Sequence, residues 1–541
     1  MKLTPKPGIL KNTIGYFKKQ EKTDLIFYFI LLLSVLLRFT KIGTQNLWYD
    51  ESYSWGMTRL SFSALIHRSF FEDVHPPFYY IILKIWRMIF GESEYALRAL
   101  SVIPSVISVM VIYRFVKEKF TSRAALLSGF LLTVSAYSIY FAHEVRMYSF
   151  LACFTICALY YFQKLIDSDF ISRENALGFI FITALGLYTH ISFVLVIASI
   201  SLWLMLYLLS EKGDLFKGRK LFIIKTYFFM MLAVIIIYIP CLYAFIFKQM
   251  DLIKGQTWRI PFNYKDLLVE NVNFLLDNSL GMFTQSLFFI KSVEDTAANV
   301  GLAHIKESVL LLIIIPLNLA AVAYFLYMSF KNRMRDQLLQ YFFLFMIIMT
   351  AMVFYVTNHI YYLYRYLFFL SPVFAAMIAL GYLNSGRVVL KRIFLTVLLG
   401  SYGLGLFFYY TEPSRDSDHR EIVSIIKANY KDGDGIMLLP IEIRHNYLYY
   451  FRNSSIIKNY DDFRDIQKEG KKSDEYWVAV DYRSKYFFVP SEELLKNPEF
   501  KDYKIDRVWN FERTRLVLIS KNNTTLPGNR ISYRETKNSI Y

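Results

Sequence analysis

The sequence predicts an α-helical membrane protein with a small α/β domain at its C-terminal end. The chain has 541 residues, of which 55% are hydrophobic and only 19% are charged. The core of a soluble protein of this size cannot bury such an apolar excess. Apolar runs of about 17–25 residues recur along residues 24–410, and each is long enough to cross a bilayer as a helix. From residue 411 onward, the composition becomes that of a soluble domain.

The apolar runs predict about eleven membrane spans. They lie at approximately residues 24–42, 95–116, 124–142, 147–166, 175–190, 191–210, 222–247, 306–330, 337–357, 360–383 and 389–410. The lysine-rich segment 1–23 predicts a cytoplasmic N-terminus, because Lys and Arg accumulate on the cytoplasmic side. Every strongly basic short loop then falls on that side as well. These loops are residues 117–123, 211–220, 331–336 and 384–392.

Residues 76–91 are apolar but do not fit this count. The run is short, begins with two prolines and contains Lys84 and Arg87. Counted as a span, it would place the basic loop 117–123 outside. We therefore expect an amphipathic helix in the outer interface, with both cations on one face.

The topology divides the chain into three parts. Residues 1–23 form a cytoplasmic segment, and residues 24–410 form the transmembrane catalytic domain. This domain has two large outer loops, at 43–94 and 248–305. Residues 411–541 form a soluble extracytoplasmic domain, in which one helical stretch and two strand-like stretches predict an α/β fold.

The net charge and the cysteines exclude two kinds of protein. The formal net charge is +17, but Lys and Arg are concentrated in short loops between spans, where topology explains them. A nucleic-acid partner is therefore rejected. The three cysteines all lie in apolar runs and indicate no disulfide framework.

Several ionisable residues lie close to the outer ends of the predicted spans. They are Asp50, Glu51, His75, Glu144, Arg146, His190, His359 and Arg365. Charges at this depth are costly, so they usually line a cavity or pair with one another. Scattered structural ion pairs would not favour one side of the membrane. Their convergence on one side therefore predicts a shared site.

Each of these residues also has a structural interpretation. The two adjacent acids could be interfacial charges within an aromatic belt, because WYDESYSW surrounds them with Trp and Tyr. His75 could cap the helix that follows it, and Glu144 and Arg146 could pair with each other. His190 could be a satisfied histidine at a helix end. Arg365 could extend its guanidinium to the interface.

Together, the residue types suit the transfer of a sugar from a polyprenyl-phosphate carrier. Arginine and histidine hold phosphate oxygens through charge-assisted hydrogen bonds. A carboxylate suits a general base for a hydroxyl nucleophile. Two other classes stay open, a transporter or lipid-carrier flippase and a non-catalytic scaffold. The transporter is disfavoured because we find no internal repeat and the charges lie at helix ends.

Six short stretches of the sequence are similar to those of the GT-C glycosyltransferases. They are WYDESYSW, HPPFYYIILKIW, FGESEYALR, SIYFAHEVRMYSF, LYTH and YRYLFFLSP. The resemblance covers about residues 20–410 and is closest to the family-39-like group. That group includes protein O-mannosyltransferases, lipid A aminoarabinose transferases and lipopolysaccharide-core galacturonosyltransferases.

The resemblance implies a GT-C fold and an inverting transfer from a polyprenyl-phosphate sugar to a hydroxyl acceptor. The acceptor is a glycolipid, a polysaccharide or a protein, and the sequence does not distinguish them. The implied location is the cytoplasmic (inner) membrane, crossed several times, with the active site on its outer face.

The resemblance also implies that Asp50 is the general base and that Glu51 is a supporting acid or acceptor ligand. Some members have an arginine shortly after the acid pair, whereas residues 52–54 here are Ser, Tyr and Ser. Another residue must therefore supply the cation for the phosphate. Paired acids can also bind Mg²⁺ or Mn²⁺ through oxygen. Asp50, Glu51 and Glu144 would be the ligands, and metal dependence stays open.

The remaining candidates are expected to bind the donor phosphate or sugar. His75 precedes Pro-Pro, where members often have a basic residue, which implies phosphate contact. Glu144 lies where the family has a second acidic residue in an outer loop. Arg365 matches the arginine of a late span. Arg146 and His190 complete this predicted donor site.

Overall fold

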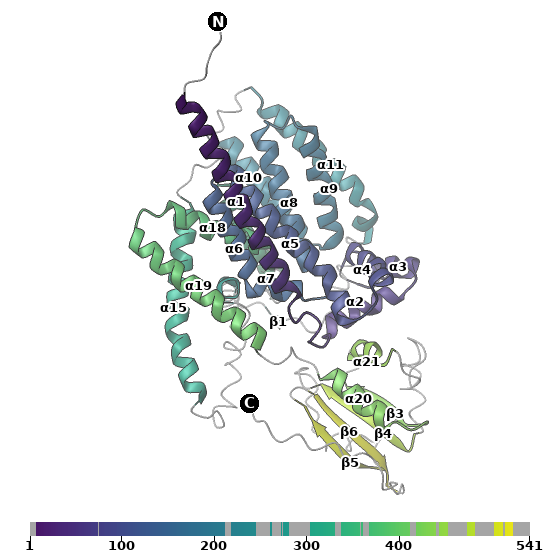
Figure 1. Ribbon diagram of the computed structural model, residues 1–541. Coiled ribbons are helices and arrows are strands. Elements are labelled where there is room, and N and C mark those ends of the chain that lie inside the picture. The colour runs from purple at the N-terminus through teal and green to yellow at the C-terminus, as the bar shows by residue number, and fades with distance from the viewer. Residues whose placement is uncertain are drawn as a thin grey trace. The chain divides into compact units, whose positions relative to one another are not determined.

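Figure 1 shows the computed structural model of the protein, in which most elements are helices. The structure describes residues 7–73, 75–210, 218–244, 260–261, 272, 274–280, 303–330, 337–357, 359–360, 367–411, 418–439, 443–452, 473–481, 502–511 and 514–522. The chain forms two compact units. The first unit comprises Met1–Ile42, Ser61–Trp86 and Arg98–Glu412, and the second comprises Gly43–Leu60, Arg87–Leu97 and Pro413–Tyr541.

The first unit consists mainly of apolar helices. In chain order they are α1 (Pro7–Phe39), α3 (Phe62–Phe71), α4 (Phe78–Phe90), α5 (Glu94–Lys119), α6 (Ser122–Val134), α7 (Ala136–Ala142), α8 (Tyr148–Asp167), α9 (Arg173–Thr189), α10 (Phe193–Leu209), α11 (Lys220–Ala244), α15 (Ala303–Ser329), α16 (Leu338–Thr357), α18 (Ser371–Asn384) and α19 (Val388–Thr411). The end of α4 and the start of α5 belong to the second unit. A short 3₁₀ helix, η5 (Phe368–Leu370), precedes α18, and the strands β1 (Ile260–Pro261) and β2 (His359–Ile360) pair antiparallel.

A helix lies on each of the predicted spans, so the predicted multi-span helical fold is confirmed. Among the described residues, α5, α8, α11 and α19 are each long and apolar enough to cross a membrane alone. The pair α6 and α7 passes the same criteria together, with a bend of 60°. The predicted span at 360–383 is helical only from Phe368 among the residues that the structure describes.

The run at 76–91 forms the separate short helix α4, as predicted. Its apolar side chains Met88 and Ile89 are exposed, as an interfacial helix requires. Lys84 of this helix is buried. Its ammonium lies 5.1 Å from the centre of the Phe62 ring, where a cation–π contact compensates part of the cost of burial.

The bend between α6 and α7 has an identifiable cause. The hydroxyl of Ser135 accepts a hydrogen bond from the backbone N–H of Ser138 at 3.2 Å, so Ser135 caps a new helix. The preceding carbonyls of Leu132 and Thr133 lie at the end of α6, where intrahelical partners run out. The guanidinium of Arg38 donates hydrogen bonds to both, at 3.1 and 3.2 Å.

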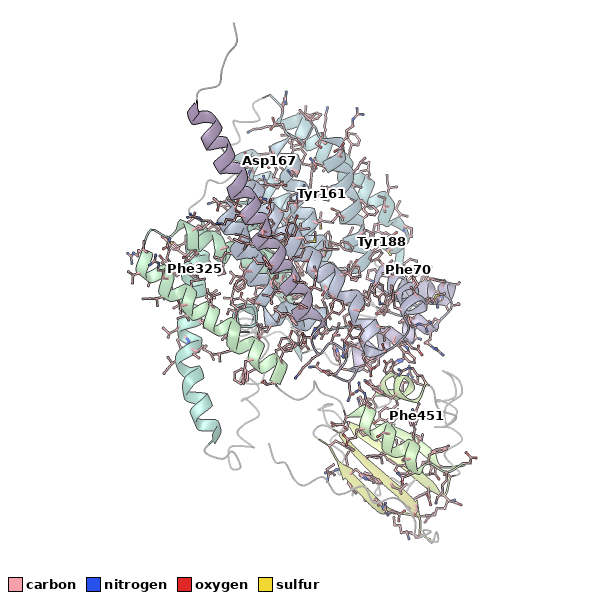
Figure 2. All side chains as sticks on the ribbon, viewed as in Figure 1. Phe70, Tyr161, Asp167, Tyr188, Phe325 and Phe451 are labelled. Carbon is pink, nitrogen blue, oxygen red and sulfur yellow. The ribbon has the colours of Figure 1, made fainter. Side chains whose placement is uncertain are left out.

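Aromatic side chains fill the core of the first unit, and Figure 2 labels several of them, among them Phe325 and Tyr161. Helix α18 approaches α15 closely at Gly381. A Cβ atom at this position would overlap the backbone carbonyl of Phe325. The contact between the two helices therefore depends on glycine, because no side chain fits.

The second unit contains a mixed four-stranded sheet. Its strands are β3 (Gly435–Leu439), β4 (Glu475–Asp481), β5 (Tyr503–Asn510) and β6 (Thr514–Lys521), in the order β3-β4-β6-β5. Strands β3 and β4 are parallel, and the other pairs are antiparallel. The unit also contains the helices α2 (Tyr49–Arg59), α20 (His419–Asn429) and α21 (Arg444–Phe451). The predicted α/β character of the C-terminal region is confirmed.

The second unit includes residues 43–60 and 87–97. The sequence assigns residues 43–94 to an outer loop of the transmembrane domain and residues 95–97 to the start of a span. Residues 43–60 and 87–97 fold together with the C-terminal residues. The predicted outer loop at 248–305 lies mostly outside the described residues, which within it are 260–261, 272, 274–280 and 303–305.

Candidate functional site

The two adjacent acids lie in the first turn of α2, within the second unit. Glu51 is fully buried, and its carboxylate accepts a hydrogen bond from the backbone N–H of Trp48 at 3.2 Å. Such a bond satisfies one of the N–H groups left unpaired at the start of a helix. Asp50 is half-buried, and its backbone carbonyl accepts the Ser54 hydroxyl at 2.9 Å. Glu51 therefore stabilises the start of α2, and Asp50 is the more accessible acid.

Three of the predicted donor-binding residues come together in the first unit. The Nη2 atom of Arg146 lies 2.9 Å from Nε2 of His75. The rings of His75 and His190 have their centres 5.2 Å apart. All three side chains are buried. The ring of Tyr148 lies beside them, 6.0 Å from the guanidinium carbon of Arg146 and 6.5 Å from the ring of His190.

Hydrogen bonding and burial keep both histidines neutral. Arginine can only donate, so Nε2 of His75 accepts and the proton is on Nδ1. Burial and the charge of Arg146 hold the pKa of His75 well below its usual value. In His190, Nδ1 accepts the backbone N–H of Ser192 at 3.1 Å, which places the proton on Nε2. Arg146 is therefore the positive charge of this group.

Local structure holds His75 in place. Its backbone N–H donates to Oδ1 of Asp73 at 3.2 Å, and the hydroxyl of Tyr80 donates to Oδ2 of the same carboxylate at 2.9 Å. Tyr80 lies in α4, directly after the two prolines. Asp73 thus ties the loop that carries His75 to the helix that follows it.

Glu144 and Arg146 lie in the short turn between α7 and α8, and both are buried. The hydroxyl of Ser101, in α5, approaches the backbone carbonyls of both residues, at 2.6 Å from Glu144 and 3.3 Å from Arg146. A small polar side chain from a neighbouring helix therefore fixes the backbone of this turn.

Arg38, near the end of α1, is a functional candidate that the sequence analysis did not select. Its guanidinium is fully buried and bonds three hydroxyl groups in addition to the carbonyls at the α6–α7 break. These are Ser34 at 2.8 Å, Ser105 at 2.7 Å and Ser138 at 2.9 Å. An arginine in a run as apolar as LLLSVLLRF is a signal that could have found it, since charges in spans are usually functional.

The backbone of Arg38 also reaches the turn that carries the candidate site. Its carbonyl accepts Nε2–H of His143 at 2.6 Å. The other ring nitrogen, Nδ1, accepts the hydroxyl of Tyr409 at 2.6 Å. Because His143 directly precedes Glu144, these bonds connect α1 and α19 to the turn.

The structure thus brings together His75, Arg146 and His190, with Glu144 in the same turn as Arg146. Asp50 and Glu51 belong to the second unit. Arg365 and the side chain of His359 lie outside the described residues. In the part of the chain that is described, no group of three or more His, Cys, Asp and Glu side chains is placed to hold a metal ion.

The chain was compared with protein families, curated proteins and solved structures. A family model described as dolichyl-phosphate-mannose-protein mannosyltransferase matches residues 74–243, a segment that includes His75, Glu144, Arg146 and His190. No curated protein matches the sequence.

Two crystal structures of ArnT from Cupriavidus metallidurans are similar to the whole chain. The structure bound to undecaprenyl phosphate has a TM-score of 0.56 at 12% sequence identity. The match covers 91% of this chain and 97% of the ArnT chain. The apo structure has a TM-score of 0.54 at 13% identity, with the same coverage. The chain has the GT-C fold. The resemblance to GT-C glycosyltransferases is therefore confirmed, and the GT-C fold and the family match support both the predicted enzyme class and a multi-pass membrane protein.

Proposed function

We propose that this protein is an inverting membrane glycosyltransferase that transfers a sugar from a polyprenyl-phosphate donor to a hydroxyl acceptor. The GT-C fold and the family match over residues 74–243 support the class of reaction. The similar ArnT structure is bound to undecaprenyl phosphate, which supports a lipid-phosphate donor. The observation that carries the proposal is the buried Arg146, whose guanidinium bonds His75, with His190 beside the His75 ring.

In this proposal, Arg146 binds the donor phosphate. His75 accepts one of its N–H groups and so orients the guanidinium. Negative charge grows on the phosphate as the bond to the sugar breaks. A fixed cation that already faces this oxygen stabilises the transition state without reorganisation. His75 is thus an orienting acceptor and not a second cation.

Asp50 is proposed as the general base that takes the proton from the acceptor hydroxyl. The role follows from the resemblance, in which the first acid of the pair is the base. Its partial exposure supports it, since a base must reach its substrate. Glu51 is proposed to support Asp50 by stabilising the start of α2. Glu144, His190 and Arg365 remain proposed donor ligands.

We further propose that the reaction takes place at the outer face of the cytoplasmic membrane. The lysine-rich N-terminal segment and the basic short loops are then cytoplasmic. A polyprenyl tail stays in the bilayer while its phosphate reaches the interface, which suits residues at the ends of spans. The acceptor is a glycolipid, a polysaccharide or a protein.

The test is a transfer assay with purified protein in lipid nanodiscs and radiolabelled undecaprenyl-phosphate sugars. Asp50→Asn should reduce turnover by about 10²–10⁴-fold, the usual contribution of a general base. Arg146→Lys should also lose activity, since a point charge cannot replace the planar guanidinium. Asp432→Asn, at an exposed acid of the second unit, is the matched control and should leave turnover unchanged.

Near-wild-type turnover by a folded Asp50→Asn protein would refute the assigned base. Movement of the labelled lipid across vesicles without transfer would instead indicate a flippase. The same assay in EDTA, followed by addition of Mg²⁺ or Mn²⁺, tests dependence on a divalent cation.

A further inference from the structure

In the second unit, helix α21 from the C-terminal region is bonded to the segment that carries Asp50. The amide of Asn446 donates to the backbone carbonyl of Leu47 at 2.8 Å, and the hydroxyl of Tyr450 accepts the backbone N–H of Leu47, also at 2.8 Å. The ring of Trp55 meets the ring of Tyr449 edge to face, with centres 5.2 Å apart. The residue two positions before α2 and a residue in the middle of α2 are therefore both attached to the same short helix.

A second connection converges on the carboxylate of Glu92, and we call it the Glu92 hub. Its Oε2 accepts Nε1–H of Trp55 at 3.1 Å and Nη1–H of Arg87 at 3.2 Å. The guanidinium of Arg59 is 3.8 Å from Oε2, and Nε of Arg452 is 3.6 Å from Oε1. The hub thus joins α2, the end of α4 and the C-terminal region.

Arg452 is the contribution of the C-terminal region to this hub. Its guanidinium lies 3.9 Å above the centre of the Tyr449 ring, and Nη1 donates to the Tyr449 carbonyl at 2.6 Å. The hydroxyl of Tyr449 in turn donates to the backbone carbonyl of Glu92 at 2.8 Å. The side chains of Glu92 and Arg452 are only 25% and 20% exposed, so water screens their ion pair less than one at the surface.

We propose that Arg452, acting through the Glu92 hub, is a positioning residue for the acid-pair helix α2. The inference rests on the proposed role of Asp50 as the base. Asp50 lies on α2 between the attachment at Leu47 and the attachment at Trp55, so both fix the rotation of the helix that carries it. The C-terminal region is then a working part of the transferase and not a separate binding module.

The test compares Arg452→Met with wild-type protein in nanodiscs by two measurements. Turnover should fall about 10- to 100-fold, because small displacements of a catalytic group have effects of this size, and the KM for the donor should change much less. Amide hydrogen exchange of residues 47–59 should become faster. Arg452→Lys, which retains the charge, should restore part of both.

Lys521→Met is the matched control, since it removes an ion pair with Asp474 at 2.7 Å from the same unit. It should change neither turnover nor the exchange of residues 47–59. If Arg452→Met does not fold, Tyr449→Phe provides the test, because it removes only the hydroxyl that bonds the Glu92 carbonyl. Its expected effects are smaller and in the same direction.

Wild-type turnover by Arg452→Met, or reduced turnover with unchanged exchange in residues 47–59, would overturn the proposal. Failure of the proposed function gives a different result. In that case the wild-type protein transfers none of the labelled sugars, while Arg452→Met still accelerates exchange in α2, which supports the positioning of this helix by α21.

Discussion

At the scale of single residues, the candidate donor site combines one cation with two neutral rings. Arg146 donates to Nε2 of His75, and Nδ1 of His190 accepts a backbone N–H. Neither histidine can therefore add a positive charge without losing a hydrogen bond.

The lowered pKa of His75 predicts that the protein loses stability in mild acid. An unfolded histidine titrates near about pH 6.5, so below this pH the unfolded chain binds a proton that the folded chain does not. This group contributes no pH dependence above about pH 6.5. Below it, the free energy of unfolding falls by up to about 1.4 kcal/mol per pH unit.

Thermal unfolding in detergent at pH 7.5 and pH 5.5 measures this effect. His75→Gln should reduce the difference between the two midpoints, whereas His67→Gln, at an exposed histidine, should leave it as in the wild type. Equal pH dependence in the wild type and in His75→Gln would contradict the prediction.

At the scale of elements, the break between α6 and α7 directs the chain toward the candidate site. A continuous helix would keep its carbonyls bonded, but the bend of 60° leaves those of Leu132 and Thr133 to Arg38. The short helix α7 then leads directly into the turn that contains Glu144 and Arg146. Arg38 thus donates to the backbone carbonyls that the helix break leaves without intrahelical partners, so these carbonyls take the place of a carboxylate partner.

Replacement of this arginine should destabilise the protein strongly. Arg38→Met removes the donors to two buried carbonyls, and each unpaired group costs about 1–3 kcal/mol. We expect a loss on the order of 3 kcal/mol in the free energy of unfolding, measured as a lower thermal midpoint in detergent. Arg387→Met, at an exposed arginine, is the control. An unchanged midpoint in Arg38→Met would show that the break does not depend on this residue.

At the scale of the whole molecule, the membrane topology decides on which side of the bilayer the proposed site residues lie. The basic loops predict that the N-terminus is cytoplasmic and that the C-terminal region is outside. The proposed roles of Asp50 and Arg146 belong to one reaction, so both residues must lie on the same side of the membrane. The loop charges predict that this is the outer side.

Cysteine labelling in intact cells tests this orientation. In a background without Cys153, Cys157 and Cys241, a membrane-impermeant maleimide should label Lys521→Cys directly. Lys119→Cys, at the end of α5, should react only after the cells are made permeable. Both variants should react equally in permeable cells, which controls for accessibility. The opposite pattern would invert the topology and exclude the proposed location.

The sequence by itself determined where the apolar membrane helices are and which fold they form, but not the short helices α2 and α3. The positions of α5, α8 and α11 follow from apolar length, a local property that the thickness of the hydrocarbon core sets. The start of α4 follows from its two prolines, and the change of composition after residue 410 marks the C-terminal α/β region. Motifs along the chain also pointed to the GT-C fold.

Only the tertiary structure decided which side chains meet. His75 and Arg146 are bonded although 71 positions separate them, and Arg38 bonds carbonyls more than 90 positions away. Residues 43–60 likewise form a unit with the C-terminal region, from which more than 350 positions separate them along the chain. Such pairings depend on how helices pack and on which buried polar groups still need a partner. Neither property produces a periodic pattern or a run of fixed length in the sequence.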